Sequence, residues 1–91
     1  MHDRDVRPLA ARTHPEVTHW ADLLPWIESV CLAFGGYFIL KIDGERAASW
    51  YTAVVNTPHP SDIVLRHDGE TAEAVVTKLA ADLETALASL A

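Results

Sequence analysis

One short run carries the residue types of a hydrolase triad, His59-Pro60-Ser61-Asp62. A triad works only when its nucleophile, base and acid converge through space, and four consecutive residues of one loop cannot adopt that geometry. Asp43 and Glu45 flank an expected tight turn, where carboxylates are solvated charges rather than an acid–base pair. Gly35-Gly36 lacks the spacing and the following helix of a phosphate-binding loop. The sequence therefore predicts no catalytic residue and no enzyme activity.

Histidine and cysteine could bind a metal or act as nucleophiles. His14 and His19 are five residues apart, whereas two imidazoles on one helical face need a spacing of about four. His59 and His67 fall in a predicted loop and at a predicted strand end. Cys31 lies on an apolar helical stripe, and a reactive thiol needs an electropositive, partly exposed environment. We therefore predict no metal ligand, no cofactor and no reactive thiol.

The composition is that of one globular domain. The chain has 91 residues, of which 49% are hydrophobic and 22% are charged. No apolar run approaches the roughly 20 residues of a membrane-spanning helix, and the charged start at 1–5 lacks the apolar segment of a secretory leader. A single cysteine excludes a disulfide scaffold. These features predict a cytoplasmic protein with no membrane partner.

Charge is unevenly distributed along the chain. The sequence has 7 basic and 13 acidic residues, which gives a net charge of −6. Residues 1–12 carry +1, so the remainder has 4 basic and 11 acidic residues, or −7. Such a body repels phosphate backbones over about 8 Å at physiological salt. The charge argues against direct nucleic-acid binding and is compatible with a basic protein partner or with ordinary solubility.

The first ordered element is predicted to be helical, because apolar residues recur at spacings of three and four. These residues are Val17, Trp20, Leu23, Leu24, Ile27, Val30, Cys31 and Phe34. Pro25 leaves two alternatives: one helix that kinks there, or a short turn at 16–23 followed by a helix that begins with Pro25. Gly35-Gly36 is expected to end the helix.

Three strands rich in aromatic and β-branched residues are predicted next. They span residues 37–42, 49–55 and 62–67. The first two are joined by a hairpin loop, Asp43-Gly44-Glu45-Arg46, and a loop with two prolines at 56–61 precedes the third. Asp68-Gly69 is expected to close the third strand and to cap the following helix.

The last helix has an apolar stripe over about five turns. Glu70 and Glu73 are expected in its first turn, where the helix dipole favours negative charge. The stripe consists of Val76, Leu79, Leu83, Ala86, Leu87 and Leu90. The sequence thus predicts an α+β fold of order α-β-β-β-α, a three-stranded antiparallel sheet with two helices packed on one face. Residues 1–14 are predicted to be a mobile tail, and residues 15–91 a single α+β domain.

Side chains of a strand alternate between the two faces of its sheet. In 37–42, Phe38, Leu40 and Ile42 are the expected inward set, so Tyr37, Ile39 and Lys41 face outward. The phase of 49–55 stays open between a set with Trp50, Thr52 and Val54 and a set with Tyr51, Ala53 and Val55. Either Arg66 or His67 joins the outer face, which is then apolar with a basic edge. Such a patch binds a partner or a second copy, unless the N-terminal segment covers it.

The predicted α-β-β-β-α order resembles the double-stranded-RNA-binding domain, which docks its second helix and nearby lysines on phosphates. Here Lys78 is the only basic residue of that helix, which also holds Glu70, Glu73, Asp82 and Glu84. Because the lysine-rich helix start of that family is missing, the resemblance implies a shared topology without RNA binding by that mode.

A second resemblance concerns the stretch Trp26 to Arg46, above all Gly35-Gly36-Tyr37-Phe38-Ile39-Leu40-Lys41-Ile42-Asp43-Gly44-Glu45-Arg46. This stretch looks like small proteins of prophages and other mobile elements, including acidic single-domain inhibitors of the anti-CRISPR kind. The resemblance covers about a quarter of the chain and transfers no site residue. It implies a small acidic protein that blocks a larger, basic, nucleic-acid-handling complex by occupying its surface.

Taken together, the sequence predicts a non-enzymatic protein-binding module, with a larger protein or ribonucleoprotein complex as its partner. The predicted partner-binding residues are aromatic or aliphatic anchors and acidic residues that steer the encounter. They are Tyr37, Ile39, Lys41, Trp50, Tyr51, Asp43, Glu45, Glu73 and Glu84. Two alternatives remain open: a homodimeric structural protein, and a nucleic-acid binder that uses Lys41, Arg46 and Arg66 with the aromatic residues.

Overall fold

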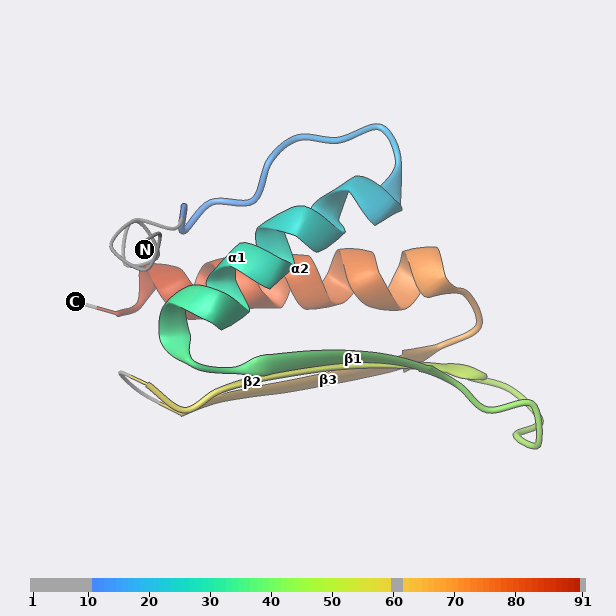
Figure 1. Cartoon of the computed structure of the whole chain (residues 1–91). Helices are drawn as coiled ribbons and strands as arrows, with labels where there is room; N and C mark the ends of the chain where they lie inside the picture. Colours follow the sequence, from blue (N-terminus) through green and yellow to red (C-terminus); the bar gives the residue numbers. More distant parts are fainter. Residues whose placement is uncertain (1–10, 60–61, 91) are drawn as a thin grey trace.

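Two helices cover one face of a three-stranded antiparallel sheet in the computed structural model, which describes residues 11–59 and 62–90 (Figure 1). The element order is α-β-β-β-α, and this confirms the predicted α+β class. The elements are a 3₁₀ turn η2 (Trp20–Leu23), α1 (Leu24–Phe34), β1 (Tyr37–Ile42), β2 (Tyr51–Thr57), β3 (Ile63–Gly69) and α2 (Ala72–Ala88).

The first helical segment is divided at its proline. The 3₁₀ turn η2 ends at Leu23, and α1 begins at Leu24 with Pro25 in its first turn. A first-turn residue needs no N–H because the helix offers it no acceptor, so proline is tolerated there. The structure is nearer to the alternative of a short turn followed by a helix, but the turn spans Trp20–Leu23 rather than 16–23, and the helix begins one residue before Pro25. Gly35 ends α1 in the left-handed conformation, at φ 71°, as its sequence position predicts.

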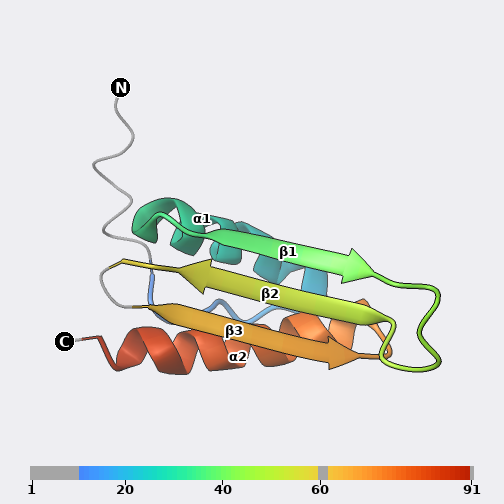
Figure 2. The same ribbon diagram turned by 90° about the horizontal axis from the view of Figure 1, so that it is seen from below.

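The strands follow one another in space as in sequence, β1-β2-β3 (Figure 2). Their bounds differ from those predicted. The β1–β2 connection runs from residue 43 to residue 50, and Ser49 within it has a positive φ of 56°, so β2 starts only at Tyr51. β2 also continues through Asn56 to Thr57, two residues into the predicted loop; the rest of that loop includes residues 60–61, which lie outside the described residues.

The third strand runs on to Gly69, so Asp68-Gly69 belongs to β3 and does not cap α2. The cap is Thr71, whose Oγ1 accepts a hydrogen bond from the Ala74 N–H at 3.0 Å. The prediction at Asp68-Gly69 was wrong because an Asp-Gly dipeptide is typical of a turn but can also end a strand. Here Asp68 and Gly69 pair with Thr52 and Tyr51 of β2, so both residues belong to the strand.

The core lies between the helices and the inner face of the sheet. Ala53 and Val55 of β2 are fully buried there, beneath an equally buried stripe of α2. That stripe contains Val75, Val76, Leu79, Ala80, Leu83 and Leu87. The phase of β2 is therefore the set with Tyr51, Ala53 and Val55 inward. Ile42, predicted to be inward, is 66% exposed, since it is the last residue of an edge strand.

Residues 11–19 lie over the helices, on the side away from the sheet (Figure 1). The Arg12 guanidinium donates to the Leu90 carbonyl at 2.8 Å, and the indole N–H of Trp26 donates to the Ala11 carbonyl at 2.8 Å. Of the predicted tail, residues 1–10 lie outside the described residues. The described N-terminal segment thus leaves the outer face of the sheet uncovered.

The start of β1 is packed against the end of β2 so closely that only glycine fits at position 36. A Cβ on Gly36 would lie 2.7 Å from Thr57 Cγ2 and 2.8 Å from Thr57 Cα. Because backbone cannot move aside cheaply, Gly36→Ala should lower the free energy of unfolding by about 2 kcal/mol or more. Urea unfolding monitored by circular dichroism measures this change.

Gly44→Ala is the matched control. A Cβ on Gly44 meets nothing within 4 Å, so its effect should stay within about 0.5 kcal/mol. Equal unfolding midpoints for the two variants would contradict the close approach of β1 and β2.

Candidate partner-binding surface

The outer face of the sheet is defined by the strand register. Because both helices lie on the inner side (Figures 1 and 2), the side chains that alternate with the core positions point away from the helices. Pairing across the strands arranges nine residues in three rows. The rows are Tyr37–Asn56–Val64, Ile39–Val54–Arg66 and Lys41–Thr52–Asp68. We refer to these nine residues as the outer face.

Four of the six residues in the first two rows of the outer face are apolar, namely Tyr37, Ile39, Val54 and Val64, and we refer to them as the apolar patch. Tyr37 is 53% exposed, Ile39 is 50% exposed and Val64 is 65% exposed. Val54 lies between Ile39 and Arg66 in the middle row and is half-buried by its neighbours. Large exposed side chains that adjoin one another on a sheet are typical of an interaction site. The patch therefore has the character of a docking surface.

The third row is polar and tightly connected. The Thr52 hydroxyl donates to Asp68 Oδ1 at 2.5 Å, and Arg46, from the β1–β2 loop, reaches both Thr52 Oγ1 at 3.2 Å and Asp68 Oδ1 at 3.4 Å. Arg66 Nε lies 3.5 Å from Asp68 Oδ2. The hydrogen bond from Thr52, together with the two guanidinium groups, lowers the pKa of Asp68 below its usual range. This network leaves Thr52 buried although it belongs to the outer face.

The basic residues gather at this polar row. Three of the four basic residues that follow residue 12 are Lys41, Arg46 and Arg66, and Asp68 is the only acidic member of the outer face. Total charge does not reveal this arrangement, because the acidic residues outnumber the basic ones elsewhere. The outer face is therefore apolar with a cationic end, on a body that is acidic overall.

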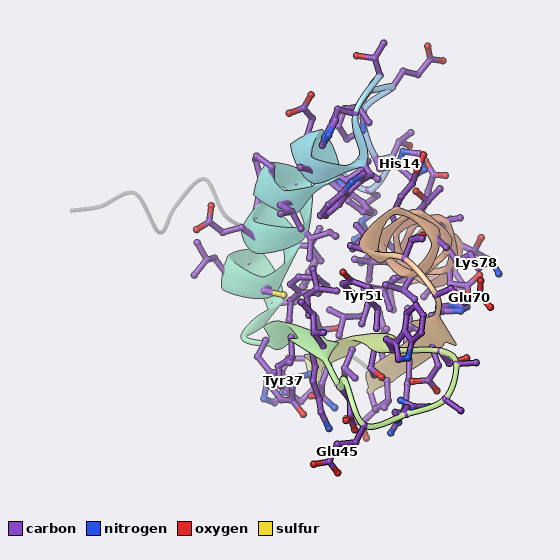
Figure 3. All side chains as sticks on the ribbon, turned by 90° about the vertical axis from the view of Figure 1, so that its right-hand side faces the viewer. His14, Tyr37, Glu45, Tyr51, Glu70 and Lys78 are labelled. Atoms are coloured by element: carbon purple, nitrogen blue, oxygen red, sulfur yellow. The ribbon has the colours of Figure 1, made fainter. Side chains whose placement is uncertain are left out.

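Of the predicted anchors, Tyr37, Ile39 and Lys41 share the outer face. Tyr51 does not: it belongs to the inner face and packs against the core, and Figure 3 shows Tyr37 and Tyr51 on opposite sides of the sheet. The expectation that Tyr51 is an outer-face anchor was wrong. Tyr51 lies on the same side of β2 as Ala53 and Val55, and that side faces the helices. Trp50 precedes β2 in the loop and is 43% exposed.

The predicted acidic residues lie elsewhere. Asp43 and Glu45 are in the β1–β2 loop, where Asp43 Oδ1 accepts a hydrogen bond from the Glu45 N–H at 3.0 Å. Glu73 is in the first turn of α2, and Glu84 accepts from the His14 N–H at 3.1 Å on the helical side. Glu73 and Glu84 therefore cannot share one contact surface with Tyr37 and Ile39.

Two residues of the patch, Val54 and Val64, were absent from the predicted set. Val54 depended on the phase of β2, which the sequence left open. Val64 could have been found by continuing the alternation from Ile63, a buried residue, through the third strand.

Metal-ligand grouping and thiol reactivity can be checked directly among the described residues. Among residues 11–59 and 62–90, no three His, Cys, Asp or Glu side chains are grouped so that they could hold a metal ion. Burial raises the pKa of the Cys31 thiol, which disfavours the thiolate. Over the same ranges, no helix has both the length and the apolarity to cross a membrane.

Comparison of the chain with protein-family models, with curated proteins and with solved structures found no match.

The lowered pKa of Asp68 makes a testable contribution to the pH dependence of stability. A carboxyl whose pKa is lower in the folded state stabilises the fold above its unfolded pKa, and this stabilisation disappears as the pH falls through the folded pKa. The stability difference between the wild type and Asp68→Asn should therefore be largest near neutral pH and shrink as the pH falls below the usual range of an aspartate pKa. Urea unfolding at a series of pH values measures it.

Asp62→Asn, which removes an exposed carboxylate outside the network, serves as the control. A difference for Asp68→Asn that is independent of pH, or that grows on acidification, would contradict the role of the network.

Proposed function

We propose that this protein is a non-catalytic protein-binding module whose partner docks on the outer face. The observation that carries the proposal is the apolar patch of Tyr37, Ile39, Val54 and Val64, which the register places together and the helices leave uncovered. Exposed aromatic and aliphatic side chains at the centre of a contact supply most of its binding energy. These residues also contribute little to the core, so their exposure is better explained by binding than by folding.

The charges beside the patch indicate the chemistry of the partner. Lys41 and Arg66 border the patch at its polar end, and Arg46 adds a third cation there. An acidic rim around an apolar centre would complement this arrangement. The proposed partner is therefore a protein surface with an apolar centre and acidic residues at one side.

A finer form of the proposal is an inhibitor of the anti-CRISPR kind that occludes a nucleic-acid-handling complex. It is supported by the resemblance of the stretch from Trp26 to Arg46 and by the acidic helical side. On that side, Asp82 is paired with His67 and Glu84 with His14. Glu73, in the first turn of α2, and Glu70, which precedes the Thr71 cap, are both exposed. A basic target would meet this helical side and not the outer face, so the two modes of binding can be separated by mutation.

The double variant Tyr37→Ala/Ile39→Ala should lose partner binding. Removing two anchors of the patch should weaken affinity by about 100-fold or more. Affinity capture followed by titration calorimetry of the captured protein measures the loss, and far-UV circular dichroism should be unchanged since both residues are half exposed.

Two control variants locate the surface. Val17→Ala, in the segment over the helices, should bind normally. Glu70→Gln/Glu73→Gln should bind normally if the outer face is used, and should lose binding if the acidic helical side is used. Undiminished binding by Tyr37→Ala/Ile39→Ala would overturn the outer-face proposal.

A second candidate function is nucleic-acid binding, favoured by the presence of Lys41, Arg46 and Arg66 on the same sheet face as Tyr37, a face without helices among the described residues. Aromatic residues and cations on one surface are typical of single-strand binders. We place this candidate second because Asp68 already engages Arg46 and Arg66, and because the chain carries −6 overall.

Salt dependence tests the second candidate. Three phosphate contacts should give a slope of about −2 for the logarithm of the association constant against the logarithm of salt concentration. Fluorescence anisotropy with labelled single-stranded RNA and DNA measures this slope, and Arg66→Ala should reduce it. The absence of binding at low salt would remove this candidate.

A further inference from the structure

We propose that a second copy of this chain docks on the free edge of β1, so that two sheets join into one of six strands. This inference goes beyond the proposed function, because it uses the strand edge and a groove on the helical side and not the centre of the outer face. Its evidence is the unpaired backbone of β1, an open apolar groove beside that backbone, and the match of the β1 sequence with itself.

The backbone of β1 offers a row of unpaired groups. β1 is an outer strand of the sheet, and no segment of the described residues pairs with its far side (Figure 2). The Asp43 N–H donates to the Trp50 carbonyl at 2.7 Å and extends the β1–β2 ladder by one pair. Since hydrogen-bonded pairs alternate in an antiparallel ladder, Phe38, Leu40 and Ile42 direct their N–H and C=O groups to the free edge.

The β1 edge lacks the features that normally prevent strand pairing. Its six residues pair one-to-one with β2 without a bulge, and they contain no proline and one charged residue, Lys41. The β3 edge differs, since it carries Arg66, His67 and Asp68 in succession. Soluble proteins protect edge strands with charges, prolines or bulges, and a long apolar edge without them is a template for another strand.

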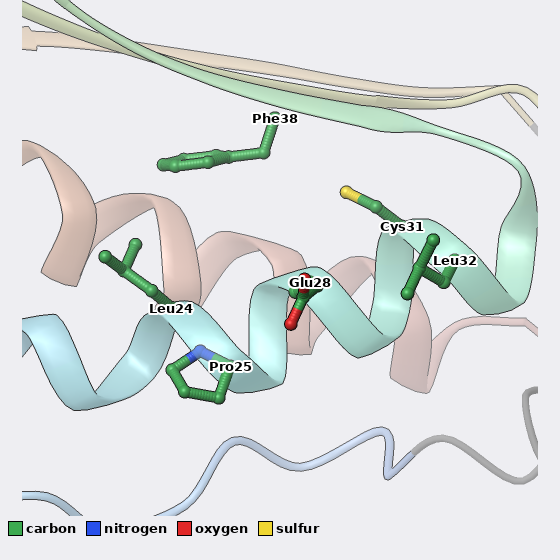
Figure 4. Close-up of a pocket in the computed structure, with 6 residues that line it drawn as sticks. All are labelled: Leu24, Pro25, Glu28, Cys31, Leu32 and Phe38. Carbon is green, nitrogen blue, oxygen red and sulfur yellow. The ribbon is translucent and has the colours of Figure 1, made fainter.

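An open groove between α1 and β1 lies beside this edge. Its volume is about 450 Å³, and six residues line it: Leu24, Pro25, Glu28, Cys31, Leu32 and Phe38. Figure 4 shows Phe38 reaching from the sheet toward α1, whose Leu24 and Cys31 form the opposite wall. Leu32 is 50% exposed at the groove. Glu28 is the only charged lining residue, and it is exposed, so its carboxylate can remain in water at the rim.

The β1 sequence complements itself in an antiparallel pair. A two-fold pairing that keeps inner residues opposite inner residues places either Ile39 or Leu40 opposite its own copy. With Ile39 on the axis, Tyr37 faces Lys41 of the second copy and Phe38 faces Leu40. With Leu40 on the axis, Ile39 faces Lys41 and Phe38 faces Ile42. No like charges meet in either register, and the Phe38–Ile42 pair of the second register is of the aromatic–β-branched kind that stabilises neighbouring strands.

The β1 edge exposes apolar side chains that a second copy can bury. Ile42 is 66% exposed, and Leu32, Tyr37 and Ile39 are each about half exposed. With Phe38, Leu24 and the strand backbone, these side chains would have to bury about 500 Å² per copy, because specific interfaces begin at about 1,000 Å² in total. The two α1 helices would lie side by side across the axis, so that each Leu32 helps to fill the groove. We therefore expect a dimer with a dissociation constant in the micromolar range.

Light scattering on the full chain tests the dimer. Between about 500 µM and 5 µM, the mass should fall from twice the chain's 10.0 kDa toward the monomer value. Ile42→Lys should weaken self-association at least tenfold, because it puts a second charge into the edge. Val64→Lys is the matched control, since Val64 has the same exposure, 65% against 66%, but lies on β3. A monomer at every concentration, or equal effects of the two variants, would overturn the proposal.

Cysteine cross-linking tests the geometry. Residues opposite their own copy have Cα atoms about 4.5–5.5 Å apart, which is within disulfide range. In a Cys31→Ala background, either Ile39→Cys or Leu40→Cys should form a covalent dimer under mild oxidation, and Val64→Cys should not. A dimer by light scattering without a cross-link at either position would place the interface elsewhere and refute the β1 edge. If Ile42→Lys no longer dimerises but still binds the partner, partner binding at the outer face does not require the dimer.

Discussion

The structure depends on the contact between α2 and the inner face of the sheet. Leu79, Leu83 and Leu87 are fully buried, as are Ala53 and Val55 beneath the helices. Burying each large aliphatic side chain contributes about 1.5–3 kcal/mol, so this layer supplies much of the stability of a short chain. Both helices of the described residues, α1 and α2, pack on this side of the sheet, and neither covers the other side. The exposed outer face follows from this one-sided packing, whereas the open β1 edge follows from the strand order β1-β2-β3.

The elements with a strong periodic pattern could be predicted from the sequence, and those that depend on tertiary contacts could not. The apolar spacing of α2 and the glycine at the end of α1 led to correct assignments, as did the aromatic and β-branched run of β1. The phase of β2 could not be predicted, since both alternatives combined an aromatic residue with β-branched ones. Only packing under the helices selects Ala53, whose small side chain lets a helix approach closely.

Part of the candidate surface could also be predicted from the sequence. Alternation within β1 assigned Tyr37, Ile39 and Lys41 to one face, and the register confirms that placement. The contribution of Arg46 could not be predicted, because it depends on how an eight-residue connection folds back over Thr52 and Asp68. Net charge was also an incomplete guide, since a negative total concealed three cations at one end of the sheet.

Alternate residues of β1 are constrained in different ways: one set must fit the core, and the other set faces away from it. Its even-numbered positions carry Phe38 and Leu40, which contact the core, whereas Tyr37 and Ile39 at odd positions contact no helix. Substitutions at the odd positions can therefore accumulate at little cost to folding. A lineage of such chains could keep one scaffold while its surface diverges rapidly, and relatives would then share the spacing of their buried residues long after their exposed residues had ceased to align.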